Sequence, residues 1–293
     1  MISACGGYDN TETRRDLQLS NDLKNDELRL LAEVLPGVSA QLRGSLGNLY
    51  MAFSRIATPE RRAEDPELDA QAALVQQSYY RLLRLAGNLT FATRLLQSEP
   101  LPLQNADLTA LTEEVYRECL PLVELANRRL TFRGEAPAVI ALHRDSLQRI
   151  LYHLISNAIK FSPAGSEISI HCRCTASQAL ITVLDQGSGI PEEKLAQLLE
   201  TPLSSVHAEP APHGLGLGLP LAKAMAEGMG GRLLLENTPS GTAATLALPL
   251  RQTSAIVQDL PFQYTGGFSA TLTELSDALP VRAFLQNPAA QQA

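Results

Sequence analysis

The stretch "HLISNAIKF", residues 153–161, belongs to a strongly amphipathic helix. Its apolar residues recur at spacings of three and four: Leu147, Ile150, Leu151, Leu154, Ile155, Ala158 and Ile159. His153, Asn157 and Lys160 share another face of the same helix. An amide oxygen suits a hydrated Mg²⁺ and an ammonium group suits phosphate, although such a face is commonly just solvated. The pattern alone leaves both interpretations open.

A second stretch, "DQGSGIP" (185–191), directly follows an apolar strand. Asp185 falls on the same side of that strand as Ile181, which places a carboxylate at the edge of the core. An adenine amino group is a fitting hydrogen-bond donor for it, and Gly187 and Gly189 would allow a flat base to approach the backbone. The alternative is a solvated aspartate in a turn that ends the strand.

A third stretch, "HGLGLGLPLAKAMAEGMGG" (213–231), places Gly214, Gly216 and Gly218 before a helix expected over about 218–229. Backbone N–H groups and a helix N-terminus at such a place favour an anion. The stretch is neither a Rossmann fingerprint nor a P-loop, because it follows a Pro-rich loop (200–213) and lacks the Gly-Lys-Ser/Thr ending.

The segments around these stretches predict an α+β sandwich, with helices on one face of a mixed sheet. A linker over 98–107 precedes a helix over about 108–128. The predicted strands are "LTFRG", "AVIAL", "EISIHCRC", "ALITVLD", "RLLLEN" and "TAATLALPL", of which the third and fourth are expected to form an antiparallel pair. Residues 251–293 form a tail with two short elements and no assigned role.

Before the linker, residues 26–98 carry heptad repeats typical of two long helices in an antiparallel hairpin. The positions are Leu28, Leu35, Leu42, Leu49 and Ile56 with Leu31, Val38, Ser45 and Ala52, then Leu68, Val75, Leu82, Leu89 and Leu96 with Ala72, Tyr79, Ala86 and Thr93. Pro36-Gly37 predicts a kink or a restart of the first helix, and residues 1–25 are expected to be a flexible leader. A second copy completing a four-helix dimer would cover the apolar seam; packing on the chain's own second domain is the alternative.

The composition of the 293 residues, 45% hydrophobic and 19% charged, fits a globular protein. A net charge of −7 argues against nucleic acid or an anionic membrane as the main partner. No apolar run reaches the ~18 residues that a membrane span needs, and the N-terminus is too polar for a signal peptide. We therefore expect a cytoplasmic protein without a membrane span.

Taken in order and at their separations, the three stretches resemble the N, G1 and G2 boxes of sensor histidine kinases, within the gyrase–Hsp90–kinase–MutL ATPase superfamily. "SGTAATLALPL" (240–250) resembles the closing Gly-Thr and last strand of that ATP-binding domain. The resemblance covers residues 26–250 and implies a dimerisation hairpin over 26–98 and an ATP-binding catalytic domain over 106–250.

The resemblance also implies the roles of single residues toward ATP and Mg²⁺. Asn157 would hold Mg²⁺, Lys160 would contact phosphate and Asp185 would bind adenine. His153 replaces the more usual Asn of the N box. The expected glycines are Gly187 and Gly189 at the base and Gly214, Gly216 and Gly218 at a phosphate-covering lid. One departure is that no Phe occurs from Ser162 to Pro261, where family members carry a Phe-containing box.

A larger departure lies in the first helix. The family's phosphoacceptor pattern runs approximately S-H-E-L-R-T-P-L, and this chain has "SAQLRGSL" over 39–46. By this alignment Ala40 replaces the phosphorylated histidine, Gln41 the acid beside it and Gly44 the Thr or Asn of the phosphatase reaction. None of the five histidines lies in the hairpin, and with Leu42 at an a position, residue 40 is expected to face outward.

Three functional hypotheses follow. The first is a dimeric ATP-binding protein of two-component signalling that cannot autophosphorylate on its own hairpin, with a response regulator or another histidine kinase as its partner. The second is an active kinase that phosphorylates a partner protein in trans. The third is a non-enzymatic dimeric scaffold that binds no ATP.

Overall fold

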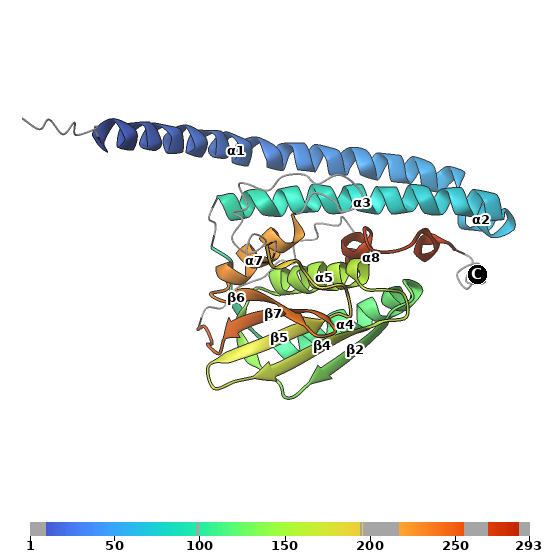
Figure 1. Ribbon diagram of the computed structural model, residues 1–293. Helices are drawn as coiled ribbons and strands as arrows, with labels where there is room; N and C mark the ends of the chain where they lie inside the picture. The colour runs from blue at the N-terminus through green and yellow to red at the C-terminus, as the bar shows by residue number, and fades with distance from the viewer. Residues whose placement is uncertain (1–9, 98–99, 194, 196–216, 255–268, 287–293) are drawn as a thin grey trace, which may run out of the picture.

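A computed structural model describes residues 10–97, 100–193, 195, 217–254 and 269–286, and within these ranges the side chains from residue 33 onward except that of Leu96. Figure 1 shows two long helices lying across one side of an α/β sandwich. The helices are α1 (Asn10–Ile56), α2 (Pro59–Glu64), α3 (Pro66–Leu96), α4 (Leu108–Leu125), α5 (Arg144–Phe161), α7 (Gly218–Gly228), α8 (Ala270–Leu275) and the 3₁₀ turn η2 (Val281–Phe284). The strands are β1 (Gln104–Asp107), β2 (Arg129–Gly134), β3 (Val139–Leu142), β4 (Glu167–Cys174), β5 (Gln178–Leu184), β6 (Arg232–Thr238) and β7 (Gly241–Pro249).

The first helix is longer than the sequence predicted. α1 starts at Asn10, so the expected leader over 1–25 is helical from that residue onward. Residues 10–25 lack an apolar repeat, but they include Glu, Arg, Leu and Lys, which have high intrinsic helix propensity. Propensity can therefore favour a helix here without an apolar face. Of the kink or restart expected at Pro36-Gly37, the restart is wrong, because α1 runs through Pro36 without ending. A proline removes one backbone hydrogen bond, and the rest of the helix carries on past it.

α1 and α3 form the expected antiparallel hairpin, and α2 with its flanking residues makes the link. Thr58 caps α2, and the Asp65 carboxylate caps α3 by accepting from the N–H groups of Glu67 and Leu68. The buried ion pair of Arg62 with Asp69, 2.7 Å apart, fixes the turn from inside. The hairpin is therefore specified locally by its capping residues as well as by its apolar repeat.

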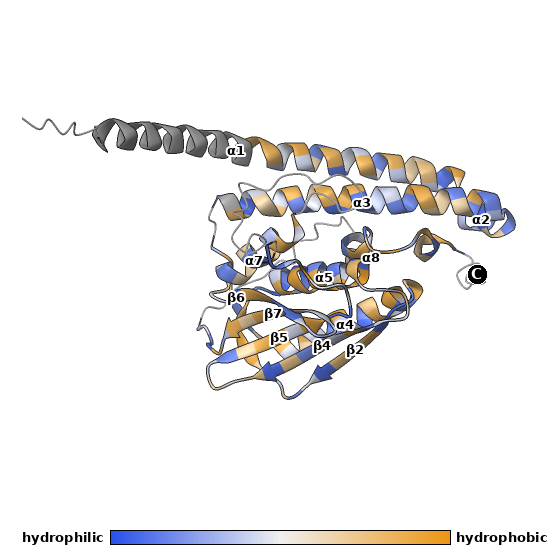
Figure 2. Ribbon diagram, in the orientation of Figure 1, coloured by the Kyte–Doolittle hydropathy of each residue, from blue (hydrophilic) through white to orange (hydrophobic). Residues whose placement is uncertain are grey.

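The face of α1 that contacts α3 is not the predicted heptad seam. Ser39 and Leu46 are buried, and the Tyr50 and Tyr79 rings are 4.6 Å apart. The seam residues Leu42 and Leu49 stay 43% and 66% exposed. Hydrophobic residues are interspersed with polar ones along α3 and along α1 from residue 33 onward (Figure 2). The exposed large hydrophobics of the hairpin are Val34, Val38, Leu42, Leu49, Met51, Ile56, Leu74, Val75 and Leu82.

The second part of the chain folds around a five-stranded mixed sheet in the order β2-β4-β5-β7-β6. β2 and β4 are parallel, and every other pair in this sheet is antiparallel, including the predicted pair β4–β5. Buried residues of α4, α5 and α7 join those of the sheet in one core. Arg133 and His171 are exposed on the strands β2 and β4, as expected of a face that no helix covers. The predicted fold class, a helical hairpin followed by an α/β sandwich, is confirmed.

The described residues of the tail form two short elements, in line with the prediction, and both pack inside the molecule. α8 contacts α3 and α5, and η2 contacts α3. Leu275, Leu279 and Phe284 are at most 5% exposed. The Gln77 side chain donates to the Leu279 carbonyl at 2.7 Å. Within the described part of the tail, α8 and η2 thus lie between the hairpin and the sandwich (Figure 1).

Candidate functional site

The candidate site is organised by α5, the helix of the "HLISNAIKF" stretch. His143 caps its N-terminus by accepting from the Ser146 N–H at 3.2 Å. The predicted apolar face of α5 is buried, with Ile150 and Ile155 fully inaccessible. His153 and Lys160 on the other face meet side chains of α3 and of the tail, with Asn157 half-buried between them on the helix.

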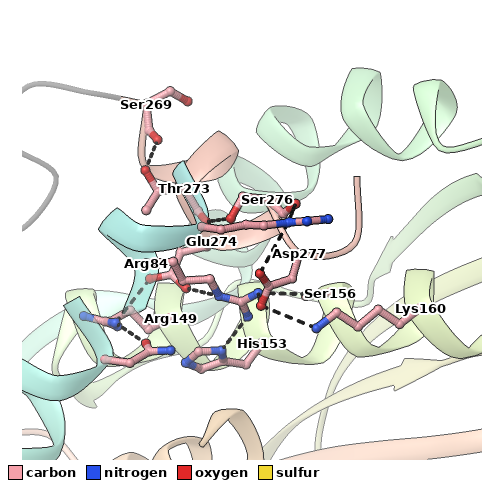
Figure 3. A network of polar contacts seen from close by, with 12 residues as sticks. Arg84, Arg149, His153, Ser156, Lys160, Ser269, Thr273, Glu274, Ser276 and Asp277 are labelled. Carbon is pink, nitrogen blue, oxygen red and sulfur yellow. Dashed lines mark hydrogen bonds and ion pairs between the residues drawn. The ribbon is translucent and has the colours of Figure 1, made fainter. Parts of the chain in front are cut away.

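His153 is fully buried beside a guanidinium group from the hairpin. Its Nδ1 atom is 3.2 Å from Nη2 of Arg84 (Figure 3). Because a guanidinium can only donate, Nδ1 is the acceptor and the proton of the neutral ring is on Nε2. Burial lowers the pKa of His153 to about 3, with Arg84, Arg149 and Lys160 acting in the same direction and Glu274 opposing them. The imidazole is therefore neutral at physiological pH.

Lys160 ends in a partly buried position at the other end of this face. Its Nζ is 3.6 Å from the Asp277 Oδ2 atom, just beyond α8. Burial lowers the pKa of Lys160, and Asp277 partly offsets this. The side chain predicted to contact phosphate is thus paired with a carboxylate of the tail.

Asp185 lies at the end of β5, the central strand of the sheet. Its Oδ1 atom accepts two backbone hydrogen bonds, from Gly187 N at 2.8 Å and Thr242 N at 3.1 Å. Backbone N–H groups therefore supply the hydrogen-bond donors that a carboxylate at the edge of the core needs. No hydrogen bond from another described residue reaches Oδ2, so that oxygen can accept from an exocyclic amine.

The glycines after Asp185 allow close approaches that a side chain would prevent. A Cβ on Gly187 would lie 2.7 Å from the Phe161 carbonyl oxygen at the end of α5. Gly189 has φ +74°, in the region that favours glycine. The Asn237 amide bridges Ile190, with Oδ1 accepting from its N–H at 2.8 Å and Nδ2 donating to its carbonyl at 2.7 Å.

A shallow groove of about 560 Å³ borders this loop. It is lined by residues 187–191 and by the β6–β7 turn over 237–241. None of its lining residues comes from α5, so it is separate from the side of the site that holds His153 and Lys160.

The third predicted box is described only in part. Gly218 begins α7, and a Cβ on it would lie 3.5 Å from Nδ1 of His153. Gly214, Gly216 and the Pro-rich stretch over 200–213 lie outside the described residues. Gly218 lies beside the middle of α5, at His153, and Gly187 lies beside its C-terminal end, at Phe161.

Four charged residues of this region were not singled out from the sequence. Arg84 and Arg149 pair with Glu274 at 3.4 and 3.3 Å, and Arg84 also pairs with Asp277 at 2.8 Å (Figure 3). Arg149 is 1% exposed, lies over the Phe91 ring and donates to Asn88 Oδ1 at 2.9 Å. The position of Arg149 between the core residues Leu147 and Ile150 indicates in the sequence that this arginine has a buried partner. The sequence around the tail carboxylates gives no comparable indication that they are buried partners.

The residues aligned with the phosphoacceptor site lie on the surface of α1. Ala40, Gln41 and Gly44 are exposed, whereas Ser39 is buried. Position 40 thus faces outward, as the heptad register predicted. The helix continues without interruption through position 40, where the side chain is only a methyl group.

No helix among those described is long and apolar enough to cross a bilayer. Residues 143–252 match the family described as histidine kinase-, DNA gyrase B- and HSP90-like ATPases. The chain is 30% identical to sensor protein IrlS of Burkholderia pseudomallei over 216 residues, which is 71% of this chain and 45% of that protein. It is 28% identical to the alginate biosynthesis sensor protein KinB of Pseudomonas aeruginosa over 228 residues, 76% of this chain and 37% of that protein.

A crystal structure of full-length ShkA in complex with AMPPNP shares the fold. Its TM-score is 0.57 at 20% identity, over 78% of this chain and 47% of that one. The chain therefore spans less than half the length of these relatives. By its matching domain and by its relatives, the chain belongs to the sensor histidine kinase family and carries an ATPase domain of the HATPase_c type.

Proposed function

We propose that this chain binds ATP with Mg²⁺ on the α5 face and reports nucleotide occupancy in two-component signalling. Asp185 would accept from the adenine amino group, Asn157 would hold Mg²⁺ and Lys160 would contact phosphate. The glycines Gly187, Gly189 and Gly218, with Gly214 and Gly216, would let the nucleotide approach the backbone. The domain division at residues 98–106 separates this unit from the hairpin.

The observation that carries the proposal is the geometry of Asp185. Oδ1 is held by two backbone N–H groups at the end of the central strand, while Oδ2 accepts nothing from the other described residues. A carboxylate fixed in this way has one oxygen oriented for an external donor. Gly187 beside it contacts the end of α5, so the base and phosphate ends of a nucleotide would lie along one helix.

The residues on this face also fit the rest of the nucleotide. Among the described residues, no group of three or more His, Cys, Asp or Glu side chains could hold a metal ion. A magnesium ion would therefore rest on the Asn157 amide oxygen, the phosphates and water, which suits its preference for few protein ligands. Lys160 and the nearby Arg84 supply cationic charge for phosphate.

The exposed apolar stripe of the hairpin supports a homodimer. Leu49 and Ile56 are 66% and 63% exposed on α1, and Val75 and Leu82 are about half exposed on α3. The alternative cover, the chain's own second domain, contacts α3 through α7, α8 and η2. Those contacts leave the stripe accessible, so a second hairpin that completes a four-helix bundle is its natural cover.

The hairpin would not accept phosphate in this protein. Ala40 offers no nucleophile, and Gln41 no general base at neutral pH. With its five histidines all outside the hairpin, the chain has no substitute acceptor there. A response regulator or another histidine kinase would then sense the nucleotide state through the shape of the dimer.

A titration of the full chain with MgATP tests nucleotide binding, followed by calorimetry and by thermal stabilisation. Wild type should bind and gain stability by mass action, and Asp185→Asn should not, because its amide repels the adenine donor. Absence of binding in wild type and in every variant described below would favour a non-enzymatic scaffold.

Incubation with γ-labelled ATP tests the missing acceptor. Wild type should carry no acid-labile phosphate on the hairpin, whereas the double variant Ala40→His/Gln41→Glu should acquire it if the site can transfer. Acid-labile label on the wild-type hairpin would contradict the proposal. Label that appears on an added histidine-bearing, catalytically dead partner would instead show an active kinase working in trans.

A further inference from the structure

We propose that the C-terminal segment around α8 is an intramolecular competitor of the nucleotide, whose carboxylates occupy the phosphate side of the α5 face. The proposal rests on the ATP site proposed above. It gives the tail a regulatory role and connects nucleotide binding to the contact between hairpin and ATPase domain.

The first observation is where the two carboxylates of the segment lie. Glu274 is fully buried, with Oε2 3.4 Å from Nε of Arg84 and Oε1 3.3 Å from Nη2 of Arg149. Asp277 Oδ2 is 2.8 Å from Nη1 of Arg84 and 3.6 Å from Nζ of Lys160. Figure 3 shows both acids pointing into the same group of cations, which come from α3 and α5.

The second observation is that Lys160 takes part both in the proposed contact with phosphate and in the contact with the tail. It is the side chain proposed to contact phosphate, and in this structure its ion-pair partner is Asp277. A phosphate group cannot take the position beside Nζ while a carboxylate stays there, because like charges at that distance repel strongly in a partly buried site. Binding of a triphosphate therefore requires Asp277 to leave.

The third observation is that the segment is anchored independently of its acids. Leu275 and Leu279 are buried, and the Phe284 ring lies 5.7 Å from the Tyr80 ring. The buried Arg62 donates to the Phe284 carbonyl at 2.9 Å. Loss of one acid contact would thus weaken the docked state without removing all of its packing.

Displacement of α8 would also change the hairpin contact. Arg84 belongs to α3 and is bound by Glu274, Asp277 and His153 at once. Departure of the two acids leaves Arg84 facing Arg149 and Lys160, a buried cationic set that a polyphosphate can neutralise. The nucleotide phosphates and the tail carboxylates are thereby alternative counterions for one site. An exchange between them would change the contacts of Arg84 and therefore of α3.

The apparent affinity for MgATP should then equal the intrinsic affinity multiplied by the fraction of molecules whose tail is undocked. Asp277→Asn removes one competing charge from a 29% exposed side chain and should preserve the fold. We expect it to tighten MgATP binding by about tenfold or more, while the affinity for adenosine, which has no phosphate, changes by less than about twofold. Glu113→Gln is the matched control, since Glu113 forms an exposed ion pair with Arg117 away from the site.

Hydrogen exchange of the unmodified full chain supplies a second measurement. Saturating MgATP should speed amide exchange over residues 270–286, and adenosine should not. Equal MgATP affinity of wild type and Asp277→Asn, or binding of MgATP without faster exchange in the tail, would overturn the competitor role alone. Loss of MgATP binding in both proteins would show instead that the ATP site itself is wrong, and the competitor role would fall with it.

Discussion

Arg84 of the hairpin donates a hydrogen bond to the ring of His153 on α5, with Nη2 and Nδ1 3.2 Å apart. The contact joins two parts of the chain at a fully buried position. It requires a neutral imidazole, because a protonated ring would have no acceptor for the guanidinium and would add a fourth cation to Arg84, Arg149 and Lys160.

Acid should therefore weaken the fold through His153. Its pKa is near 6.5 when unfolded and about 3 when folded, so the unfolded state binds the proton first and stability falls as the pH drops from about 6.5 toward 3. The slope from this one group is about 1.4 kcal/mol per pH unit, or about 2 kcal/mol between pH 6.5 and 5. Urea unfolding of wild type and His153→Asn measures it, and the variant should lack this part of the slope. The exposed His171→Asn is the control; an equal slope in wild type and His153→Asn would contradict the expectation.

Removal of the Asp185 carboxylate should destabilise the loop that it organises. Asp185→Ala leaves the N–H groups of Gly187 and Thr242 without their acceptor, at a cost of about 1–3 kcal/mol. Asp185→Asn keeps an oxygen at the Oδ1 position and should retain most of the stability while losing nucleotide. Chemical unfolding of the two variants separates the roles, and an Ala variant as stable as the Asn variant would show that these hydrogen bonds contribute little.

Gly241 should not tolerate a side chain. A Cβ there would lie 2.3 Å from the Asp185 carbonyl oxygen, so Gly241→Ala must push β7 away from the nucleotide loop. We expect a loss of about 1–3 kcal/mol in unfolding free energy. Gly44→Ala is the opposite case, because nothing lies within 4 Å of that Cβ on an exposed helix, and it should gain about 0.5–1 kcal/mol. Thermal unfolding compares the two; a neutral Gly241→Ala would contradict the close approach.

A charge on the apolar stripe should break the proposed dimer. Leu49→Glu places a carboxylate on a side chain that is 66% exposed in one copy, and light scattering should show a shift toward monomer. Ala40→Glu adds the same charge to the same helix on the outward face and should leave the dimer intact. Similar masses for both variants, whether monomeric or dimeric, would mean that the stripe is not the interface.

The sequence by itself predicted most of the helices and strands and supplied the residues proposed for the site. Heptad spacing predicted the hairpin, and alternation predicted the strands of the sheet, because both patterns depend on neighbours within a few residues. Asn157, Lys160 and Asp185 were predicted as site residues from short motifs for the same reason. The capping side chains of Thr58, Asp65 and His143 define where α2, α3 and α5 begin. Apolar periodicity alone locates these helix starts less precisely.

Only the tertiary structure decided which surfaces the elements bury. It placed Ser39 and Leu46 at the α3 contact and left Leu42 and Leu49 of the predicted seam accessible. It also brought Asp277 to Arg84, 193 residues earlier in the chain, and so gave the tail a place on the α5 face. A buried ion pair between distant segments depends on the packing of every element between them, and no local pattern records it. The nucleotide motifs could be recognised in the sequence, whereas the carboxylates that compete for their site could be found only in the fold.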